Sequence, residues 1–223
     1  MTAAALVAAT GAPAVAPKKA PVPAAEPFAM RGVRLGITID EFKALPIVTD
    51  EGETEPLTAC SNEPMPDERI RIENMLDSDR EAGMVTCQWF ARTPYLSSRS
   101  YDRHFIDLGT GKGQPSFEFI SDGTNYRLFR ISFFANNQYH TGILDALTRN
   151  YGPPKVLNES FQTRSGASLP NTTSIWSNGS STIILDQRCV QADRYCLTYS
   201  HHALGRIYKA ARERLAASQA GKI

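Results

Sequence analysis

The chain has 223 residues, and its 24 basic residues almost balance its 23 acidic ones. Nucleic-acid-binding domains usually carry a clear basic excess, so this balance argues against a nucleic-acid partner. Hydrophobic residues make up 42% of the chain and charged residues 21%, as in ordinary globular proteins. No apolar run approaches the roughly 20 residues that a membrane-spanning helix needs. We therefore expect a soluble globular protein without a transmembrane segment.

Residues 1–27 differ from the rest of the chain, because they are almost entirely Ala, Pro and Val. The apolar stretch 3–16, with small residues at Ala14 and Ala16, fits the end of a cleaved signal peptide. No Lys or Arg precedes this stretch, and the repeated prolines also fit an extended linker. Both interpretations stay open. Both place residues 1–27 outside a folded part that begins at residue 28.

Four cysteines fall into two local pairs along the chain. Their spacing suggests the disulfides Cys60–Cys87 and Cys189–Cys196, although four cysteines permit three pairings. A structural zinc site normally uses pairs of cysteines two to four residues apart, and the sequence has no such pair. Because disulfides persist in oxidising compartments, we expect a periplasmic or secreted protein.

The clearest local signal is a capping box formed by Thr38 and Glu41, with Ile37 and Phe42 at the positions of a hydrophobic staple. It predicts a short helix of about two turns, which the next proline ends. Several prolines interrupt residues 47–82, and we interpret this stretch as a surface excursion that the first disulfide holds in place.

Segments rich in β-branched and aromatic residues predict strands at 84–90, 104–108, 116–120, 126–135, 174–176, 181–186 and 195–199. Hairpin turns are predicted at 121–123 and 178–179. Helical spacing of apolar residues predicts helices at 139–151 and at about 202–217. The polar segment 158–172 is predicted to be a loop. The residues expected to face inward on the last helix are Leu204, Ile207, Tyr208, Ala211 and Leu215.

The order helix, strands, helix, strands, helix, with hairpin connections, predicts an α+β fold. We expect an antiparallel β-sheet packed against a few helices, with two disulfides. A single domain over residues 28–223 is the simplest arrangement. The alternative is two sub-modules that meet near residues 136–155.

The motif V-x-L-G-I-T-x-x-E-F over residues 33–42 resembles the helix opening of β-lactamase-inhibitory-protein-like modules. The small lipoprotein of the outer-membrane β-barrel assembly machinery has a related pattern. The ending L-x-x-x-Y-G-x-P over residues 147–154 resembles a helix ending of exported bacterial proteins. The resemblance implies a capped helix that leads into an antiparallel sheet, and a protein that binds another protein. It implies no particular functional residue.

Residue patterns of common catalytic sites are absent from the sequence. The glycine-rich segment 109–113 lacks the order of a phosphate-binding loop, and we interpret it as a hairpin loop. Asp107 and Glu118 could face one cleft from neighbouring strands, but chance readily produces such a pair among 23 acidic residues. We interpret the four histidines as surface or capping residues. We predict no catalytic residue, metal site or cofactor.

One weak indication of a partner is the basic surface of the last helix, with Arg206, Lys209, Arg212 and Arg214. These residues complement the helix dipole, or they contact an acidic partner or an anionic lipid surface, so peripheral membrane contact stays open. We expect an exported, non-catalytic protein-binding module of the bacterial envelope, such as an accessory subunit, assembly factor or inhibitor. Its partner would be another envelope protein. The alternatives are a carrier of a small apolar or lipid ligand in an enclosed cavity and a hydrolase without a recognisable motif.

Overall fold

The structure is a computed structural model that describes residues 25–49, 54–72, 75–92, 101–108 and 111–220. In this part of the chain ten strands form one sheet: β3 (Thr54–Cys60), β4 (Val85–Arg92), β5 (Tyr101–Arg103), β6 (Ile106–Asp107), β7 (Lys112–Ser121), β8 (Tyr126–Asn136), β9 (Lys155–Gln162), β10 (Ser168–Ser177), β11 (Ser181–Asp186) and β12 (Arg194–His201). The other elements are the hairpin β1 (Ala29–Met30) and β2 (Val33–Arg34) and the helices α1 (Ile39–Lys43), α2 (Asp77–Glu81), α3 (His140–Tyr151) and α4 (His202–Ala220).

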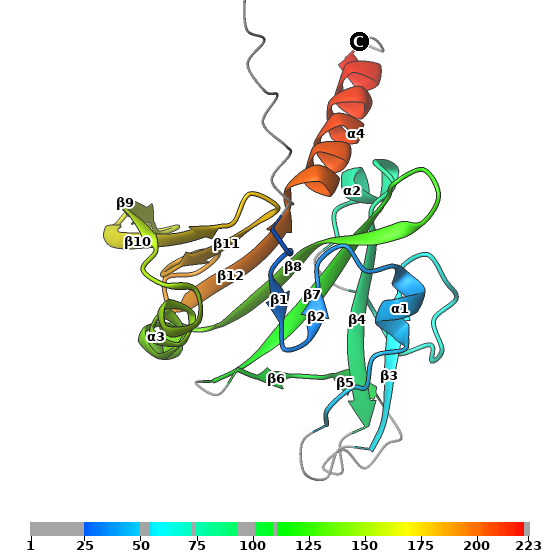
Figure 1. Cartoon of the computed structure of the whole chain (residues 1–223), viewed down its shortest axis with the longest axis horizontal. Coiled ribbons are helices and arrows are strands. Elements are labelled where there is room, and N and C mark those ends of the chain that lie inside the picture. The colour runs from blue at the N-terminus through cyan, green and yellow to red at the C-terminus, as the bar shows by residue number, and fades with distance from the viewer. Residues whose placement is uncertain (1–24, 50–53, 73–74, 93–100, 109–110, 221–223) are drawn as a thin grey trace, which may run out of the picture.

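The sheet is antiparallel, in the order β3-β4-β7-β8-β12-β11-β10-β9. β5 pairs with β4 and β6 pairs with β7. The strand direction turns across the sheet, from nearly vertical in β4 to nearly horizontal in β11 (Figure 1), as the natural twist of strands requires. Strands from both sides of residues 136–155 belong to this one sheet. The predicted α+β fold with an antiparallel sheet is confirmed, and so are the disulfides Cys60–Cys87 and Cys189–Cys196.

The two faces of the sheet differ in composition, because successive side chains of a strand point to opposite faces. One row of paired residues crosses the sheet as Trp176, Ile183, Tyr199, Ile131, Phe117 and Cys87. The row one residue away is Ser177, Thr182, Ser200, Arg130, Glu118 and Thr86. We call the side of the first row the packed face and the side of the second row the open face.

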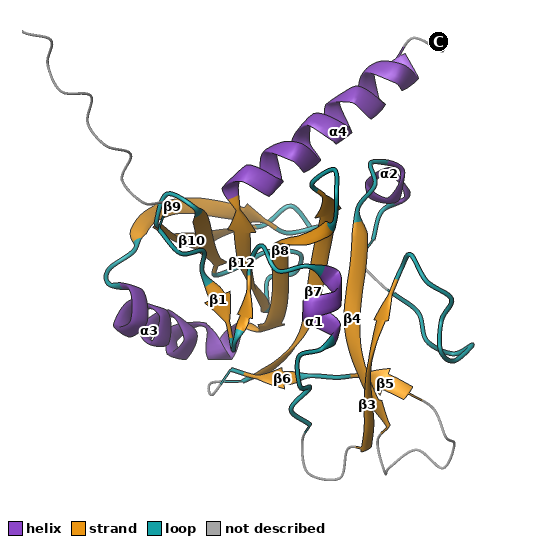
Figure 2. Ribbon diagram, turned by 45° about the vertical axis from the view of Figure 1, so that its right-hand side comes forward, coloured by secondary structure: helices purple, strands orange, loops and turns teal. Residues whose placement is uncertain are grey.

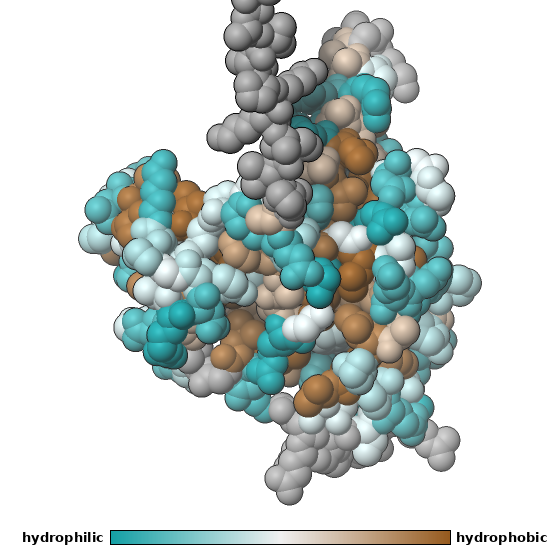
Figure 3. Space-filling view, in the orientation of Figure 1, coloured by the Kyte–Doolittle hydropathy of each residue, from teal (hydrophilic) through white to brown (hydrophobic). Residues whose placement is uncertain are grey.

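Helices and the small hairpin cover the packed face. Met30, Val33, Phe42, Ile143 and Leu147, from β1, β2, α1 and α3, are buried in one cluster with the apolar row of the sheet. In Figure 1 these covering elements lie in front of the sheet. Seen from that side, hydrophobic and hydrophilic residues are interspersed over the surface (Figure 3). The main core of the protein therefore lies between the packed face and these elements.

The predicted capping box is present at the start of α1. The Thr38 hydroxyl accepts a hydrogen bond from the Glu41 amide at 3.2 Å, and the Thr38 amide donates to the Glu41 carboxylate at 2.7 Å. α1 has five residues and ends at the cap residue Ala44, so it is shorter than the predicted two turns. Gly36 donates its amide to the carbonyl of Leu128 at 2.8 Å. This bond fixes the helix start on β8, so that Phe42 reaches the core.

Two sequence predictions about strands are wrong. The polar segment 158–172 is not a loop, because it forms most of the hairpin of β9 and β10. The stretch 47–82 is not only an excursion, because it contains the edge strand β3. Both errors concern strands at or beside an edge of the sheet. There, polar side chains remain in water and Pro56 needs no partner for its missing amide.

α4 projects from the sheet, and only its beginning is packed (Figure 2). Leu204 is buried, but Ile207 is 37% exposed. The prediction that the apolar residues of this helix face inward is therefore correct only near its start. The hydroxyl of Tyr208 donates to the carboxylate of Asp79 at 2.6 Å, and Arg212 donates to the same carboxylate at 2.7 Å. α4 is thus tied to α2 by polar contacts. None of the described helices is both long and apolar enough to cross a membrane.

Candidate functional site

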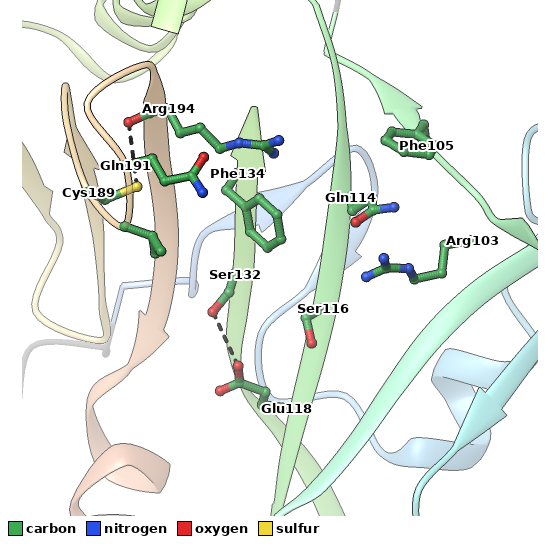
Figure 4. A pocket seen from close by; sticks show the side chains of 11 residues that line it. Arg103, Phe105, Gln114, Ser116, Glu118, Ser132, Phe134, Cys189, Gln191 and Arg194 are labelled. Atoms are coloured by element: carbon green, nitrogen blue, oxygen red, sulfur yellow. Dashed lines mark hydrogen bonds between the residues drawn. The ribbon is translucent and has the colours of Figure 1, made fainter. Parts of the chain in front are cut away.

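A pocket of about 630 Å³ lies on the open face. Its floor is formed by Gln114, Ser116 and Glu118 of β7 and by Ser132 and Phe134 of β8. One wall carries Arg103 and Phe105, and the opposite wall carries Cys189, Val190, Gln191 and Arg194 (Figure 4). All of these residues belong to strands or loops. None of the described helix residues lines the pocket, which opens to solvent.

The wall formed by the β11–β12 loop is held by a disulfide. Cys189 is bonded to Cys196, and the seven residues of separation make this a small closed loop. The amide of Cys189 donates to the carbonyl of Arg194, and the amide of Arg194 donates to the carbonyl of Gln191, both at 3.2 Å. These bonds fix the loop backbone beside β8. Val190 and Gln191 therefore stand at the rim, where both are exposed.

The opposite wall depends on a close approach of strands. The amide of His104 donates to the carbonyl of Trp89 at 2.9 Å, which holds the start of the β5–β6 segment against β4. Gly113 pairs with Ile106 of β6. A Cβ atom at Gly113 would lie 2.7 Å from the carbonyl oxygen of Phe134. Glycine is thus the residue that lets β7 pass at this point with β6 on one side and β8 on the other.

A buried ion pair lies in the pocket floor. The Glu118 carboxylate pairs with the guanidinium of Arg130 and accepts a hydrogen bond from the Ser132 hydroxyl at 3.2 Å. Glu118 is only 6% exposed. Burial raises the pKa of Glu118, and the neighbouring Arg130 works against that rise. Both the charge and the hydrogen-bonding capacity of this carboxylate are therefore largely used inside the protein.

The same ion pair connects the pocket floor with α4. The Arg130 guanidinium carbon lies 5.2 Å from the centre of the Phe129 ring and 5.5 Å from that of Tyr208, distances at which a cation is attracted to an aromatic face. Tyr208 in turn binds Asp79, as described above. A continuous chain of polar and aromatic contacts therefore runs from the pocket to α2.

The rim of the pocket combines positive charge with apolar surface. The Arg194 guanidinium carbon lies 5.9 Å from the centre of the Phe134 ring. Phe105 is 43% exposed and Val190 is 73% exposed, so each wall presents apolar surface to the pocket. Arg103 and Arg194 approach the pocket from opposite sides (Figure 4). An occupant would therefore meet apolar groups at both walls and at least one guanidinium.

Asp107 and Glu118, the two carboxylates that could have shared a cleft, do not lie together in the structure. Glu118 lines the pocket, but Asp107 is not among its lining residues. The carbonyl group of Asp107 accepts a hydrogen bond from Arg31, in the turn of the β1–β2 hairpin. Glu118 is thus the pocket's one carboxylate within the described part of the chain.

The histidines also differ from the sequence prediction. His104 and His140 are buried and not at the surface, with exposed fractions of 2% and 6%. His202 is held at the start of α4, where its ring nitrogens lie 2.6 Å from the Thr182 hydroxyl and 2.8 Å from the Gly179 carbonyl. None of the four lines the pocket. Among the described residues no group of three or more His, Cys, Asp or Glu side chains could hold a metal ion.

The basic residues predicted on α4 do not form one common surface. Arg212 turns toward α2 and pairs with Asp79. Arg206, Lys209 and Arg214 are exposed, and Lys209 lies 3.9 Å from Glu213. All four lie outside the pocket lining. Their role as an interaction surface stays a prediction.

The pocket itself was missed by the sequence analysis, although a signal for it exists. In β7 and β8 the polar residues Gln114, Ser116, Glu118, Arg130 and Ser132 alternate with buried apolar ones. This alternation predicts a wet face, but it does not show which loops rise at its borders. The pocket depends on the two walls, and both come from segments distant in sequence.

Comparisons with protein-family models, with curated proteins and with solved structures found no match. The resemblance to β-lactamase-inhibitory-protein-like modules therefore stays a prediction that rests on two short motifs. The fold alone places this chain among α+β proteins with an antiparallel sheet and two disulfides.

Proposed function

We propose that this protein is an exported, non-catalytic binding module of the bacterial envelope that holds another envelope protein on its open sheet face. The observation that carries the proposal is the pocket on that face, where the exposed side chains of Phe105 and Val190 stand on opposite walls and Arg194 lies on the wall with Val190 (Figure 4). Aromatic residues and arginine dominate the binding energy of many protein interfaces, especially where they surround a depression. Such a rim fits a protein partner.

The shape of the pocket favours a protein partner over a small apolar ligand. A carrier of lipids or similar ligands needs an enclosed cavity, commonly between a sheet and its helices. This pocket lies on the face away from the main core, and none of the helix residues that the structure describes lines it. A segment of another protein could enter it from solvent and continue over the neighbouring polar strands.

The chemistry of the pocket gives less support to a hydrolase. A general acid or base needs a titratable group that can exchange a proton with the substrate. Glu118 is engaged by Arg130 and Ser132, and the pocket lining contains no histidine. The proposed role of these residues is to form a rigid polar floor.

Two disulfides support the proposed location in an oxidising compartment. One of them, Cys189–Cys196, shapes a pocket wall. Reducing conditions would therefore be expected to alter the proposed binding surface directly. For this reason the proposed binding partner belongs to the envelope and not to the cytoplasm.

A site-directed crosslinking experiment tests the proposal. A photo-crosslinking amino acid replaces Gln191 at the pocket rim, and in a matched control it replaces Asn150, an exposed residue of α3 on the other side of the sheet. In cells of the source organism, the Gln191 variant should yield a discrete adduct with an envelope protein that mass spectrometry identifies. The control should not yield this adduct. Equal adducts from both positions, or none from Gln191 in the folded and oxidised protein, would contradict the proposal.

A further inference from the structure

Charge in the pocket is the starting point for a more specific inference, which rests on the proposed function. Among the described lining residues, the charged ones are Arg103, Arg194 and Glu118. Glu118 is compensated by Arg130, which lies beside it in the same row of the sheet. The side chains that face an occupant therefore carry a net positive charge.

Arg194 is the residue best placed to bind an anion. Its guanidinium lies over the Phe134 ring. Within the residues that the structure describes, the guanidinium makes no hydrogen bond and no ion pair. An arginine presents five N–H donors in a planar fork that matches a carboxylate. The stack on Phe134 orients this fork, so little side-chain freedom would be lost on binding.

The groups around Arg194 suit a peptide. Gln114 and Gln191 offer amides that can both donate to and accept from a peptide backbone. Phe105 and Val190 offer apolar surface at opposite walls. A simple inorganic anion would use the guanidinium and leave the apolar walls exposed to water. An acidic residue with apolar neighbours would use all of these groups.

The width of the pocket gives the length of the occupant. From β12 across β8 and β7 to β6 there are three strand spacings, or about 14 Å. An extended chain rises about 3.3 Å per residue, so about four residues would cross the pocket.

We infer that the pocket binds an extended acidic segment of the partner protein, with a carboxylate of that segment on Arg194 and apolar side chains against Phe105 and Val190. The carboxylate can come from an acidic side chain or from a chain terminus, because both present the same group to the guanidinium. The bond is a charge-assisted hydrogen bond of the kind that arginine forms with carboxylates. Salt should weaken it.

Nuclear magnetic resonance can test this inference with the whole oxidised protein and defined peptides. The probes are the capped peptide Ac-Ala-Leu-Glu-Leu-Ala-NH2, its Gln analogue, and Ac-Ala-Leu-Ala-Leu with a terminal carboxylate. The Glu peptide should shift the side-chain Nε–H signal of Arg194 and the amides of residues 132–134 and 189–191. The Gln analogue should bind about fivefold more weakly, because the charge-assisted bond is lost. The third probe shows whether a chain terminus can replace the acidic side chain.

Two variants make the result specific. R194Q should lower the affinity for the Glu peptide to that for the Gln analogue. R149Q changes an exposed arginine of α3 and should leave the affinity unchanged. Equal binding of the Glu and Gln peptides, shifts outside the pocket, or no shift at millimolar peptide would overturn the inference. If crosslinking at Gln191 nevertheless captures an envelope protein, the proposed function stands and only the acidic segment is wrong.

Discussion

The packed face and the open face are built from the same strands, yet they serve different ends. On the packed face, Phe117 and Ile131 are completely buried under α1 and the β1–β2 hairpin. On the open face, their chain neighbours Ser116 and Ser132 line the floor of the pocket. The open face is covered only in part: Leu204 of α4 packs against Ile120 and Phe129, but none of the described helix residues lines the pocket. The pocket region can therefore keep polar groups and a binding surface. Successive side chains of a strand point to opposite faces, so the same strands can form the core on one face and the pocket floor on the other.

The disulfides follow the same division. Cys60–Cys87 belongs to the core cluster of the packed face, where both residues are almost fully buried. Cys189–Cys196 closes the loop at the pocket rim. We therefore expect changes of the buried apolar residues on the packed face to lower stability, and changes of the exposed residues around the pocket mainly to alter binding. The predictions below test this difference.

The largest expected loss of stability comes from Phe117→Ala. The Phe117 ring lies 4.5 Å from that of Phe42 and 4.6 Å from that of Trp89, measured between centroids. Its removal should lower the free energy of unfolding by about 3–5 kcal/mol, because it leaves a cavity in the core. Ser116→Ala, the adjacent change on the open face, should cost less than about 1 kcal/mol. Urea unfolding measures both, and similar losses would contradict the division between the faces.

The two disulfides should differ in the next experiment. Replacing Cys60 and Cys87 by Ala opens a loop with a sequence separation of 27 residues. The chain-entropy relation then gives a loss of about 3.5 kcal/mol, plus a further cost for the core site. Replacing Cys189 and Cys196 opens a loop with a separation of 7 residues, for which the same relation gives about 2.4 kcal/mol.

Binding should show the opposite order for these two double variants. The loss of Cys189–Cys196 should weaken capture at Gln191 in crosslinking, because the pocket wall is no longer held. The loss of Cys60–Cys87 should leave capture unchanged at a temperature where that variant is folded. Urea unfolding and the crosslinking yield are measured on the same samples. Equal effects of both variants on capture would show that the rim disulfide has no special role in the pocket.

The fold was predictable from sequence wherever local patterns agree with the core. The capping box at Thr38, the hairpin signal at residues 178–179 and the apolar spacing of α3 all predicted elements that the structure contains. Each of these signals arises from residues close together in the chain. The two disulfides were also predictable, because each links cysteines that are near one another in sequence.

The remaining features depend on contacts that no local pattern contains. β9 is polar because both of its sides are largely exposed at the sheet edge, so its composition resembles that of a loop. His140 is polar and begins a helix, yet tertiary packing buries it beside Tyr195. The pocket forms where the wall that carries Arg103 and the wall that carries Arg194 lie on either side of β7 and β8 (Figure 4). Such positions are decided by strand order, which the sequence alone left open.

Arg130→Met should give an intermediate loss of about 2–4 kcal/mol, because it leaves the buried Glu118 carboxylate without its cation. Without Arg130, its lowering effect on the pKa of Glu118 is lost, so burial raises this pKa further, opposed only by the hydrogen bond from Ser132. The folded state then binds a proton more tightly than the unfolded state, so the loss should shrink as the pH falls from 7 to 5. Urea unfolding at both pH values tests this. The double variant R130M/E118Q should recover stability at pH 7, and a failure to do so would show that Arg130 stabilises the sheet mainly through its packing.

The smallest expected effect is a dependence of stability on pH that comes from the packed face. His140 is buried near the Tyr195 ring, and its Nε2 atom has no hydrogen-bond partner within the described residues. Burial lowers the pKa of His140, and the charge of Arg188 lowers it further. The unfolded chain therefore binds more protons below pH 6.5, and stability should fall as the pH decreases through that value. His140→Gln removes this titration, so its unfolding free energy should change less between pH 7 and pH 5 than that of the unmodified protein. His201→Gln is the matched comparison, because burial also lowers the pKa of His201, and it should flatten the profile in the same direction. If His140→Gln and the unmodified protein show the same change of unfolding free energy between pH 7 and pH 5, the buried site accepts the charged imidazole. The packed face would then tolerate a buried charge that its apolar composition argues against.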